Sequence, residues 1–224
     1  MTHTTHGRNH QRYRAAAMSE IPRRPFGATG LEVTTLGFGA MELRGPPDGP
    51  ALSDEDAGRL LNAVLDEGKV RFVGVSGFLP NLDAQIGMGV FEAYQIPYSA
   101  LQREHEQAIE RASAAGAGIV IRGGVARGTP DDWESRRYYM VDNETLRNRW
   151  EAARLDDLLD GSSRTSFLLR FTLSHPGLDT TIVGTSSLAH LRDNIASAAL
   201  GPLPDDVLAE ARRRLDAAGS RSAG

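Results

Sequence analysis

Short runs of β-branched and other apolar residues alternate with longer amphipathic segments along most of this chain. Glycine or polar residues bound the short runs, which is typical of buried parallel strands. The longer segments place apolar residues three or four positions apart, which predicts helices with one face against a sheet. This alternation predicts an α/β fold with a parallel sheet and crossover helices. We expect strands at 34–41, 71–75, 91–96, 118–121 and 180–183.

The segments between these strands predict the helices. Before the first strand, two short extended pieces flank Ala28-Thr29-Gly30 within 24–36, which predicts a hairpin. Asn143 is expected to cap its helix, and a Pro-Gly pair closes the helix that ends at His175. We expect helices at 53–67, 81–88, 103–115, 143–159 and 163–175, with two more after Ser187 and from Pro204.

The first twenty positions differ in composition from the rest of the chain. Residues 1–20 are mostly Thr, His, Arg, Asn and Gln, so we expect a disordered tail. This tail lacks the apolar stretch of a secretory signal. Met18, followed by Ser-Glu-Ile-Pro, and Met1 are both candidates for the true start. We therefore expect one domain over 21–224, in a cytoplasmic protein.

Composition excludes several classes of function. The net charge of −4 and the isoelectric point near 5.9 give no support to binding of nucleic acid or an anionic membrane. The absence of cysteine excludes disulfides, thiolate metal sites and cysteine nucleophiles. No apolar run approaches the roughly 20 residues of a membrane-spanning helix. We expect no metal site, no nucleic-acid partner and no membrane partner.

The segment from Thr180 to Asn194 carries the clearest functional pattern. Gly184 turns the chain after a short strand, and the hydroxyls of Thr185, Ser186 and Ser187 fall where a helix begins. The backbone N–H groups at a helix start are unpaired and partly positive, so they can bind a phosphate. The same residues also fit a strand, a serine cap and an amphipathic helix with no ligand, and the pattern leaves both readings open.

Three motifs carry a resemblance to a known family. Gly-Thr-Ser-Ser-x-x-His-Leu-x-x-Asn at 184–194 resembles the last strand-to-helix segment of the aldo/keto reductases. Pro-Phe-Gly-Ala-Thr-Gly-Leu-Glu-Val at 25–33 and Gly-Phe-Gly-Ala-Met at 37–41 are similar to the family's hairpin and first barrel strand. The resemblance covers nearly all of 24–218. It implies a TIM (β/α) barrel and an NADPH-dependent oxidoreductase that reduces a small-molecule carbonyl, an aldehyde or ketone, to an alcohol.

The resemblance also implies an internal deletion. The family continues from a helix ending like Leu65-Asp-Glu-Gly68 into its second strand, but here Lys69-Val-Arg-Phe-Val-Gly-Val-Ser follows, which resembles the fifth strand. A βα unit takes roughly 30 residues and a barrel about 250, so this junction fits the loss of about three units. We therefore expect an incomplete TIM barrel with about five parallel strands, crossover helices and an N-terminal hairpin.

The implied deletion removes the family's catalytic residues. Members use a Tyr to protonate the carbonyl oxygen, together with Lys, Asp and His from the second to fourth strands or the loops after them. Lys69, the single lysine, precedes the fifth-type strand, and His105, His175 and His190 lie in other elements. No catalytic residue can be assigned, and this chain is expected to be inactive.

The resemblance also implies which residues of this chain would bind the cofactor. At the nicotinamide end, Ser76 and Gln95 would bind the carboxamide, and Arg122 would stack on the ring. Gly123 and Gly124 would admit the pyrophosphate close to the backbone. At the adenosine end, the resemblance implies a phosphate loop, a 2′-phosphate contact and an adenine-binding pair. The phosphate loop would be Gly184, Thr185, Ser186 and Ser187. His190 would contact the 2′-phosphate, and Asp193 with Asn194 would bind the adenine.

Five strands cannot close a barrel, so two sheet edges stay open and predict a homo-oligomer or aggregation. The sheet can run in chain order, with 34–41 and 180–183 at its edges. Alternatively, the last strand pairs with the first, which leaves 34–41 and 71–75 at the edges. Residues that the lost strands once covered are expected among Val73, Val75, Phe91, Ile119, Ile121, Ile182 and Val183.

Three functional hypotheses stay open. The chain is an oxidoreductase by lineage that still binds cofactor, a non-catalytic half-barrel that oligomerises, or a poorly folding remnant of a full-length reductase.

Overall fold

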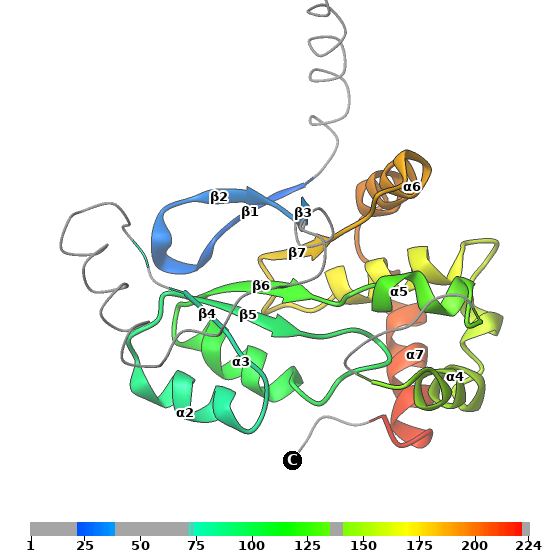
Figure 1. The fold of residues 1–224 in the computed structure, drawn as a ribbon, viewed down its shortest axis with the longest axis horizontal. Helices are drawn as coiled ribbons and strands as arrows, with labels where there is room; N and C mark the ends of the chain where they lie inside the picture. The colour runs from blue at the N-terminus through cyan, green and yellow to red at the C-terminus, as the bar shows by residue number, and fades with distance from the viewer. Residues whose placement is uncertain (1–21, 39–71, 73, 135–140, 221–224) are drawn as a thin grey trace, which may run out of the picture.

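The computed structural model describes residues 22–38, 72, 74–134 and 141–220 of the chain (Figure 1). The predicted tail at 1–20, the predicted helix at 53–67, and Lys69 lie outside the described residues.

The predicted hairpin is present at the start of the described chain. Strands β1 (Arg23–Pro25) and β2 (Glu32–Thr34) pair antiparallel, and Gly30 takes a left-handed φ of 71° after the short 3-10 turn Gly27–Thr29. Position 118 requires glycine, because a Cβ there would lie 2.9 Å from the Phe26 ring. The hairpin therefore packs against the amino-terminal ends of the main strands, and its prediction is confirmed.

The main sheet has five parallel strands, β3 (Leu36–Phe38), β4 (Gly74–Ser76), β5 (Ala93–Pro97), β6 (Gly118–Arg122) and β7 (Thr180–Val183). Their order in the sheet is β3-β7-β6-β5-β4. The last strand therefore pairs with the first, as in the second of the two predicted arrangements, and the chain-order arrangement is wrong. In the part of the chain that the structure describes, β3 and β4 form the two edges.

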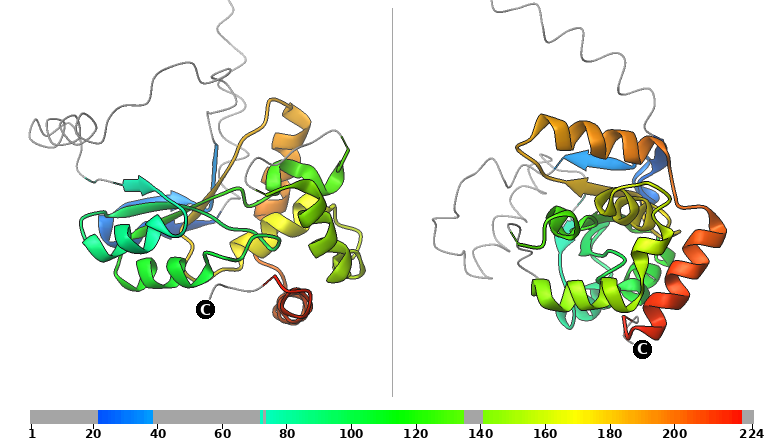
Figure 2. Two further views of the ribbon diagram at one scale, coloured as in Figure 1. Left: turned by 60° about the horizontal axis from the view of Figure 1, so that its bottom comes forward. Right: turned by 90° about the vertical axis from the view of Figure 1, so that its right-hand side faces the viewer.

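Helices α2 and α3 lie against one face of this sheet, and α4, α5, α6 and α7 lie beyond the carboxyl ends of its strands (Figures 1 and 2). Helices α2, α3 and α5 follow β4, β5 and β6, α6 follows β7, and α7 packs against α4. The helices are α2 (Asn81–Met88), α3 (Glu106–Ala114), α4 (Asn143–Ala152), α5 (Arg164–Leu173), α6 (Leu188–Ala199) and α7 (Asp205–Ala217), with 3-10 turns η3 (Ala126–Asp131) and η4 (Leu155–Leu158).

The hydrophobic core lies between the sheet and these helices. Ile96, Ile119 and Ile121 of the strands are fully buried there, together with Ile109 of α3 and Phe171 of α5. The inward residues predicted for α3, Ala108, Ile109 and Ala112, are all buried. The face of the sheet toward these helices, which we call the covered face, therefore carries these buried apolar residues.

The other face of the sheet carries Ser76, Gln95, Val120, Arg122 and Ile182, and we call this set the inner face. Side chains alternate along a strand, and the register aligns Ser76 with Gln95 and Gln95 with Val120. All five residues are exposed or partly exposed.

Of the residues among which uncovered ones were expected, one lies on the inner face. Ile119, Ile121 and Val183 are buried on the covered face, because the alternation of the strands turns them toward the helices. Val75 and Phe91 pack partly against the same core, and Ile182 alone of the described members belongs to the inner face. Val73 lies outside the described residues.

The predicted helix at 143–159 is broken. Its cap is Asp142, whose Oδ1 accepts from the Thr145 N–H at 2.8 Å, and not Asn143. The helix ends at Ala152, and Arg154 takes a left-handed φ of 48° before η4. This turn brings Asp156 back to Trp150, whose Nε1–H donates to Asp156 Oδ1 at 3.1 Å.

Candidate functional site

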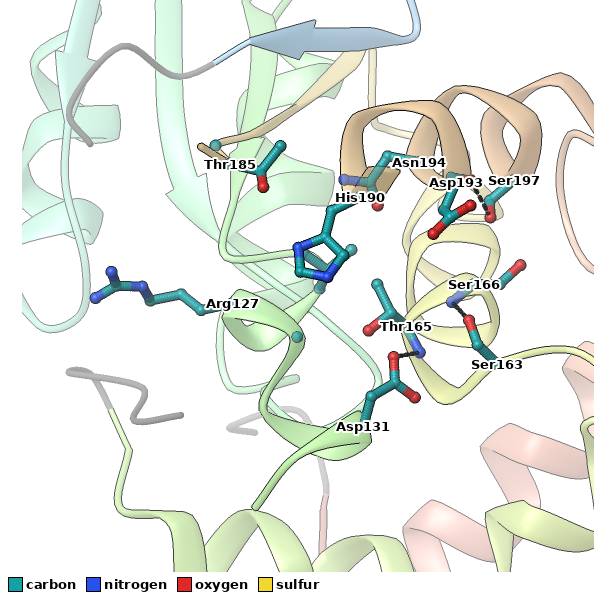
Figure 3. Close-up of a pocket in the computed structure, with 13 residues that line it drawn as sticks. Arg127, Asp131, Ser163, Thr165, Ser166, Thr185, His190, Asp193, Asn194 and Ser197 are labelled. Atoms are coloured by element: carbon teal, nitrogen blue, oxygen red, sulfur yellow. Dashed lines mark hydrogen bonds between the residues drawn. The ribbon is translucent and has the colours of Figure 1, made fainter. Parts of the chain in front are cut away.

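A cavity of about 260 Å³ opens at the carboxyl end of the sheet, between α6, α5 and η3 (Figure 3). We call it the α6 cavity. Its lining from the β7–α6 segment is Gly184, Thr185, His190, Asp193, Asn194 and Ser197. The facing wall comes from Val125, Arg127, Gly128, Asp131, Ser163, Thr165 and Ser166.

Side-chain hydroxyl groups accept hydrogen bonds from backbone N–H groups at the start of α6. Ser187 Oγ accepts from the His190 N–H at 3.3 Å and so caps the helix, and Thr185 Oγ1 accepts from the Ser187 N–H at 3.1 Å. Of the predicted phosphate loop, Gly184 and Thr185 line the cavity, whereas Ser186 and Ser187 do not. Ser187 therefore has a structural role as the helix cap.

The carboxamide of Asn194 lines the cavity, although the residue is almost completely buried. The residue is 7% exposed, and its carboxamide makes no hydrogen bond to the residues that the structure describes. Its side-chain atoms are not among the polar atoms that are closed to solvent, so the carboxamide can bond to a ligand or to water in the cavity. The predicted adenine-binding position therefore presents an accessible polar group to the cavity.

The imidazole of His190 lies in the middle of the cavity, on the first turn of α6 (Figure 3). Asp193 lies beside Asn194, and its backbone carbonyl accepts from Ser197 Oγ at 2.7 Å. His190, Asp193 and Asn194, all predicted from the sequence, are therefore brought together.

The α5 wall is already satisfied internally. Asp131 accepts from the N–H groups of Arg164 at 3.0 Å and Thr165 at 3.2 Å. Ser163 Oγ accepts from the Ser166 N–H at 3.0 Å. These side chains occupy the first amides of α5, which is capped in the same way as the start of α6.

The sequence reasoning missed this α5 wall. Its residues come from segments that are far from 184–197 along the chain and meet it only in the folded structure. One signal was available, because helix starts that follow parallel strands gather at the same end of a sheet. Ser163 marks such a start.

The residues predicted for the nicotinamide end lie elsewhere. Ser76 Oγ donates to Gln95 Oε1 at 3.2 Å, and Arg122 ends β6 on the same inner face. None of the three lines the α6 cavity. The structure therefore joins Ser76 to Gln95 but places this end of the site on an open face.

Two glycines follow β6, and each position favours glycine for a different structural reason. Gly123 takes a left-handed φ of 74°, which favours glycine. A Cβ at Gly124 would lie 3.0 Å from both Thr172 Cγ2 and Thr181 Oγ1, so α5 packs closely over this position. Packing of α5 on β7 is sufficient to require Gly124.

Two further properties of the described residues concern other classes of site. No group of three His, Asp or Glu side chains within them could hold a metal ion. None of the helices they form has both the length and the apolar character of a membrane span.

The parallel sheet, its strand order and the cavity at the carboxyl ends of the strands define an incomplete (β/α) barrel. The aldo/keto reductase family model matches residues 35–215, and the chain belongs to the aldo/keto reductase family. Members of this family are oxidoreductases that generally use NAD(P)H.

Solved structures of similar fold agree with this assignment. An aldo-keto reductase from Bacillus halodurans in its apo form gives a TM-score of 0.59 at 21% identity, over 78% of this chain and 61% of that one. Its holo form gives 0.57 at 22% identity, over 75% and 57% of the two chains. The glycerol dehydrogenase of Gluconobacter oxydans gives 0.57 at 19% identity, over 77% and 58%.

The chain thus spans about 60% of the length of these solved relatives. No curated protein matches it.

Proposed function

We propose that this chain binds NADPH and holds it chiefly by the adenosine half, in the α6 cavity. The observation that carries the proposal is the Asn194 carboxamide, which lines the cavity, is 7% exposed and has no partner among the described residues. A nucleotide base offers the donors and acceptors that would satisfy it.

The other residues of the cavity fit the remaining parts of the adenosine half. Asp193 would accept from the base, and the start of α6 at Gly184 and Thr185 would meet the phosphates. His190 would face the 2′-phosphate. At the nicotinamide end, Ser76, Gln95 and Arg122 of the inner face would contact the ring, where the bound cofactor supplies a hydride.

We further propose that the chain does not reduce carbonyl compounds by the family's reaction. No Asp-Tyr-Lys-His set can be assigned in the sequence, so the proton donor of that reaction is missing. General acid catalysis is worth about 10² to 10⁴-fold in rate. We expect no NADPH consumption with nitrobenzaldehyde; turnover that follows the protein through purification would contradict this.

A titration of NADPH fluorescence tests the binding proposal. Asn194→Ala should weaken binding about tenfold, because the ligand loses a buried hydrogen-bond partner. Asn148→Ala is the matched control, since Asn148 is exposed on α4, and should leave binding unchanged. Equal affinities for Asn194→Ala and the unmodified protein would overturn the assignment of the cavity.

A second candidate is a non-catalytic half-barrel that assembles with a second copy. The observations that favour it are β4, which is an edge strand of the described sheet, and the exposed residues Met88 and Val90 between the end of α2 and β5, at 62% and 61% exposed. Open sheet edges and exposed apolar residues both favour association. The Discussion gives its test.

A further inference from the structure

The loop between β4 and α2 is held by a histidine from another element. The Leu79 N–H donates to His105 Nε2 at 3.2 Å. His105 stands immediately before α3 and is 6% exposed. The contact therefore ties the loop after β4 to the start of α3, away from the α6 cavity.

This contact requires the neutral imidazole. With Nε2 as acceptor, the ring proton of neutral His105 resides on Nδ1, which is buried without a partner among the described residues. A protonated ring donates from both nitrogens and cannot accept from Leu79. Protonation therefore replaces this hydrogen bond with two N–H donors, that of Leu79 and that of His105 Nε2, which face each other.

The loop begins at the nicotinamide end of the proposed cofactor site. Gly77, its first residue, donates its N–H to the Gln95 carbonyl at 3.2 Å and continues the ladder between β4 and β5. Directly before it, Ser76 Oγ donates to Gln95 Oε1 at 3.2 Å. β4 is an edge strand of the described sheet and pairs there with β5 alone, and the contact between His105 and Leu79 holds the loop three residues after Ser76.

Charged groups from three elements face the His105 ring. Burial is the largest influence on its pKa and lowers it, Arg122 at the end of β6 lowers it further, and Glu104 and Asp83 raise it. Glu104 is paired with Arg149 at 2.9 Å, and Asp83 is paired with Arg111. Both carboxylates thus have cationic partners of their own, and the neutral ring is favoured near pH 7.

We propose that His105 is a positioning residue: in its neutral form it fixes the β4–α2 loop and the Ser76–Gln95 pair, and its protonation releases them. That the released pair alters the nicotinamide environment rests on the proposed function; the loop contact itself does not.

Amide hydrogen exchange of Leu79, measured by NMR on the full chain between pH 8 and pH 5, tests the contact. After correction for the intrinsic pH dependence of exchange, Leu79 should exchange roughly five- to tenfold faster once His105 is protonated. His105→Gln offers a side-chain oxygen as acceptor and no titrating group, so it should keep protection with no pH step. His105→Phe should lack protection at every pH.

A Leu79 amide with no pH step in the unmodified protein would overturn the proposal. So would protection in His105→Phe equal to that of the unmodified protein. If His105→Phe fails to fold, the pH step and its absence in His105→Gln still decide the matter.

Fluorescence of bound NADPH, followed over the same pH range, separates this proposal from the proposed function. A change that tracks the Leu79 step, and is absent in His105→Gln, supports both. A Leu79 step without any NADPH binding supports the role of His105 and overturns the proposed function.

Discussion

The two faces of the five-stranded sheet differ sharply in how they are covered. On the face toward the helices, Ile96, Ile119 and Ile121 are fully buried, whereas Gln95, Val120 and Arg122 of the same strands are partly exposed on the inner face. A complete barrel buries both faces. This chain therefore keeps the helix-covered half of a barrel core, and its stability must come from that half.

The same contrast divides the candidate cofactor site. The α6 cavity lies between α5, α6 and η3, so its walls come from elements that the structure describes. Ser76, Gln95 and Arg122 lie on the inner face, where nothing described encloses them. An open face leaves a ligand more hydrated, so we expect the adenosine half to supply most of the binding energy.

Adjacent residues on β6 provide the sharpest test of the two faces. Ile121→Ala should lower the free energy of unfolding by about 2–5 kcal/mol, because it opens a cavity in the covered core. Val120→Ala, on the inner face, should cost less than about 1 kcal/mol, since the residue is partly exposed. Urea denaturation measures both. Equal losses would show that the inner face is also packed.

Acid should weaken the covered side through His175. This residue is 1% exposed, and burial lowers its pKa to about 4. The unfolded chain takes up the proton near pH 6.5, so stability falls as pH drops from 6.5 toward 4, by up to about 3 kcal/mol. Urea denaturation at pH 7 and pH 4.5 should show this component, and His175→Gln should lack it. An unchanged pH dependence in the variant would contradict the assignment.

Assembly through the β4 edge is the smallest of these effects. We expect a dimer or larger species by size exclusion with light scattering at micromolar concentration. Val90→Glu should weaken it roughly tenfold, because a charge desolvated at the interface costs at least 1.4 kcal/mol. Leu200→Glu, at an equally exposed position after α6, is the matched control. A cooperatively melting monomer of the unmodified chain would contradict the expectation of assembly.

The sequence predicted the elements best where local patterns and packing agree. Strand β7 at Thr180–Val183 and helix α2 at Asn81–Met88 have the predicted bounds. The break in the predicted helix at 143–159 was missed, because it depends on a contact between Trp150 and Asp156 that no local pattern records.

Part of the candidate site was predicted from the resemblance to the aldo/keto reductases. His190, Asp193 and Asn194 lie on one helix, and helical spacing brings them together. Asp131 and Thr165 were missed because they reach the cavity from other segments. The sequence did not separate Ile182 from Ile119 and Ile121 in the set of expected uncovered residues, since apolar character alone does not say which face of a strand is buried.

Calorimetric titration with the two halves of the cofactor tests the central claim most directly. Adenosine 2′,5′-bisphosphate should bind within about tenfold of NADPH, and nicotinamide mononucleotide should bind at least about 100-fold more weakly, a difference of roughly 2.7 kcal/mol. This result would place the retained binding in the α6 cavity. Binding of nicotinamide mononucleotide as tight as that of the adenosine fragment, or binding of neither, would contradict the account.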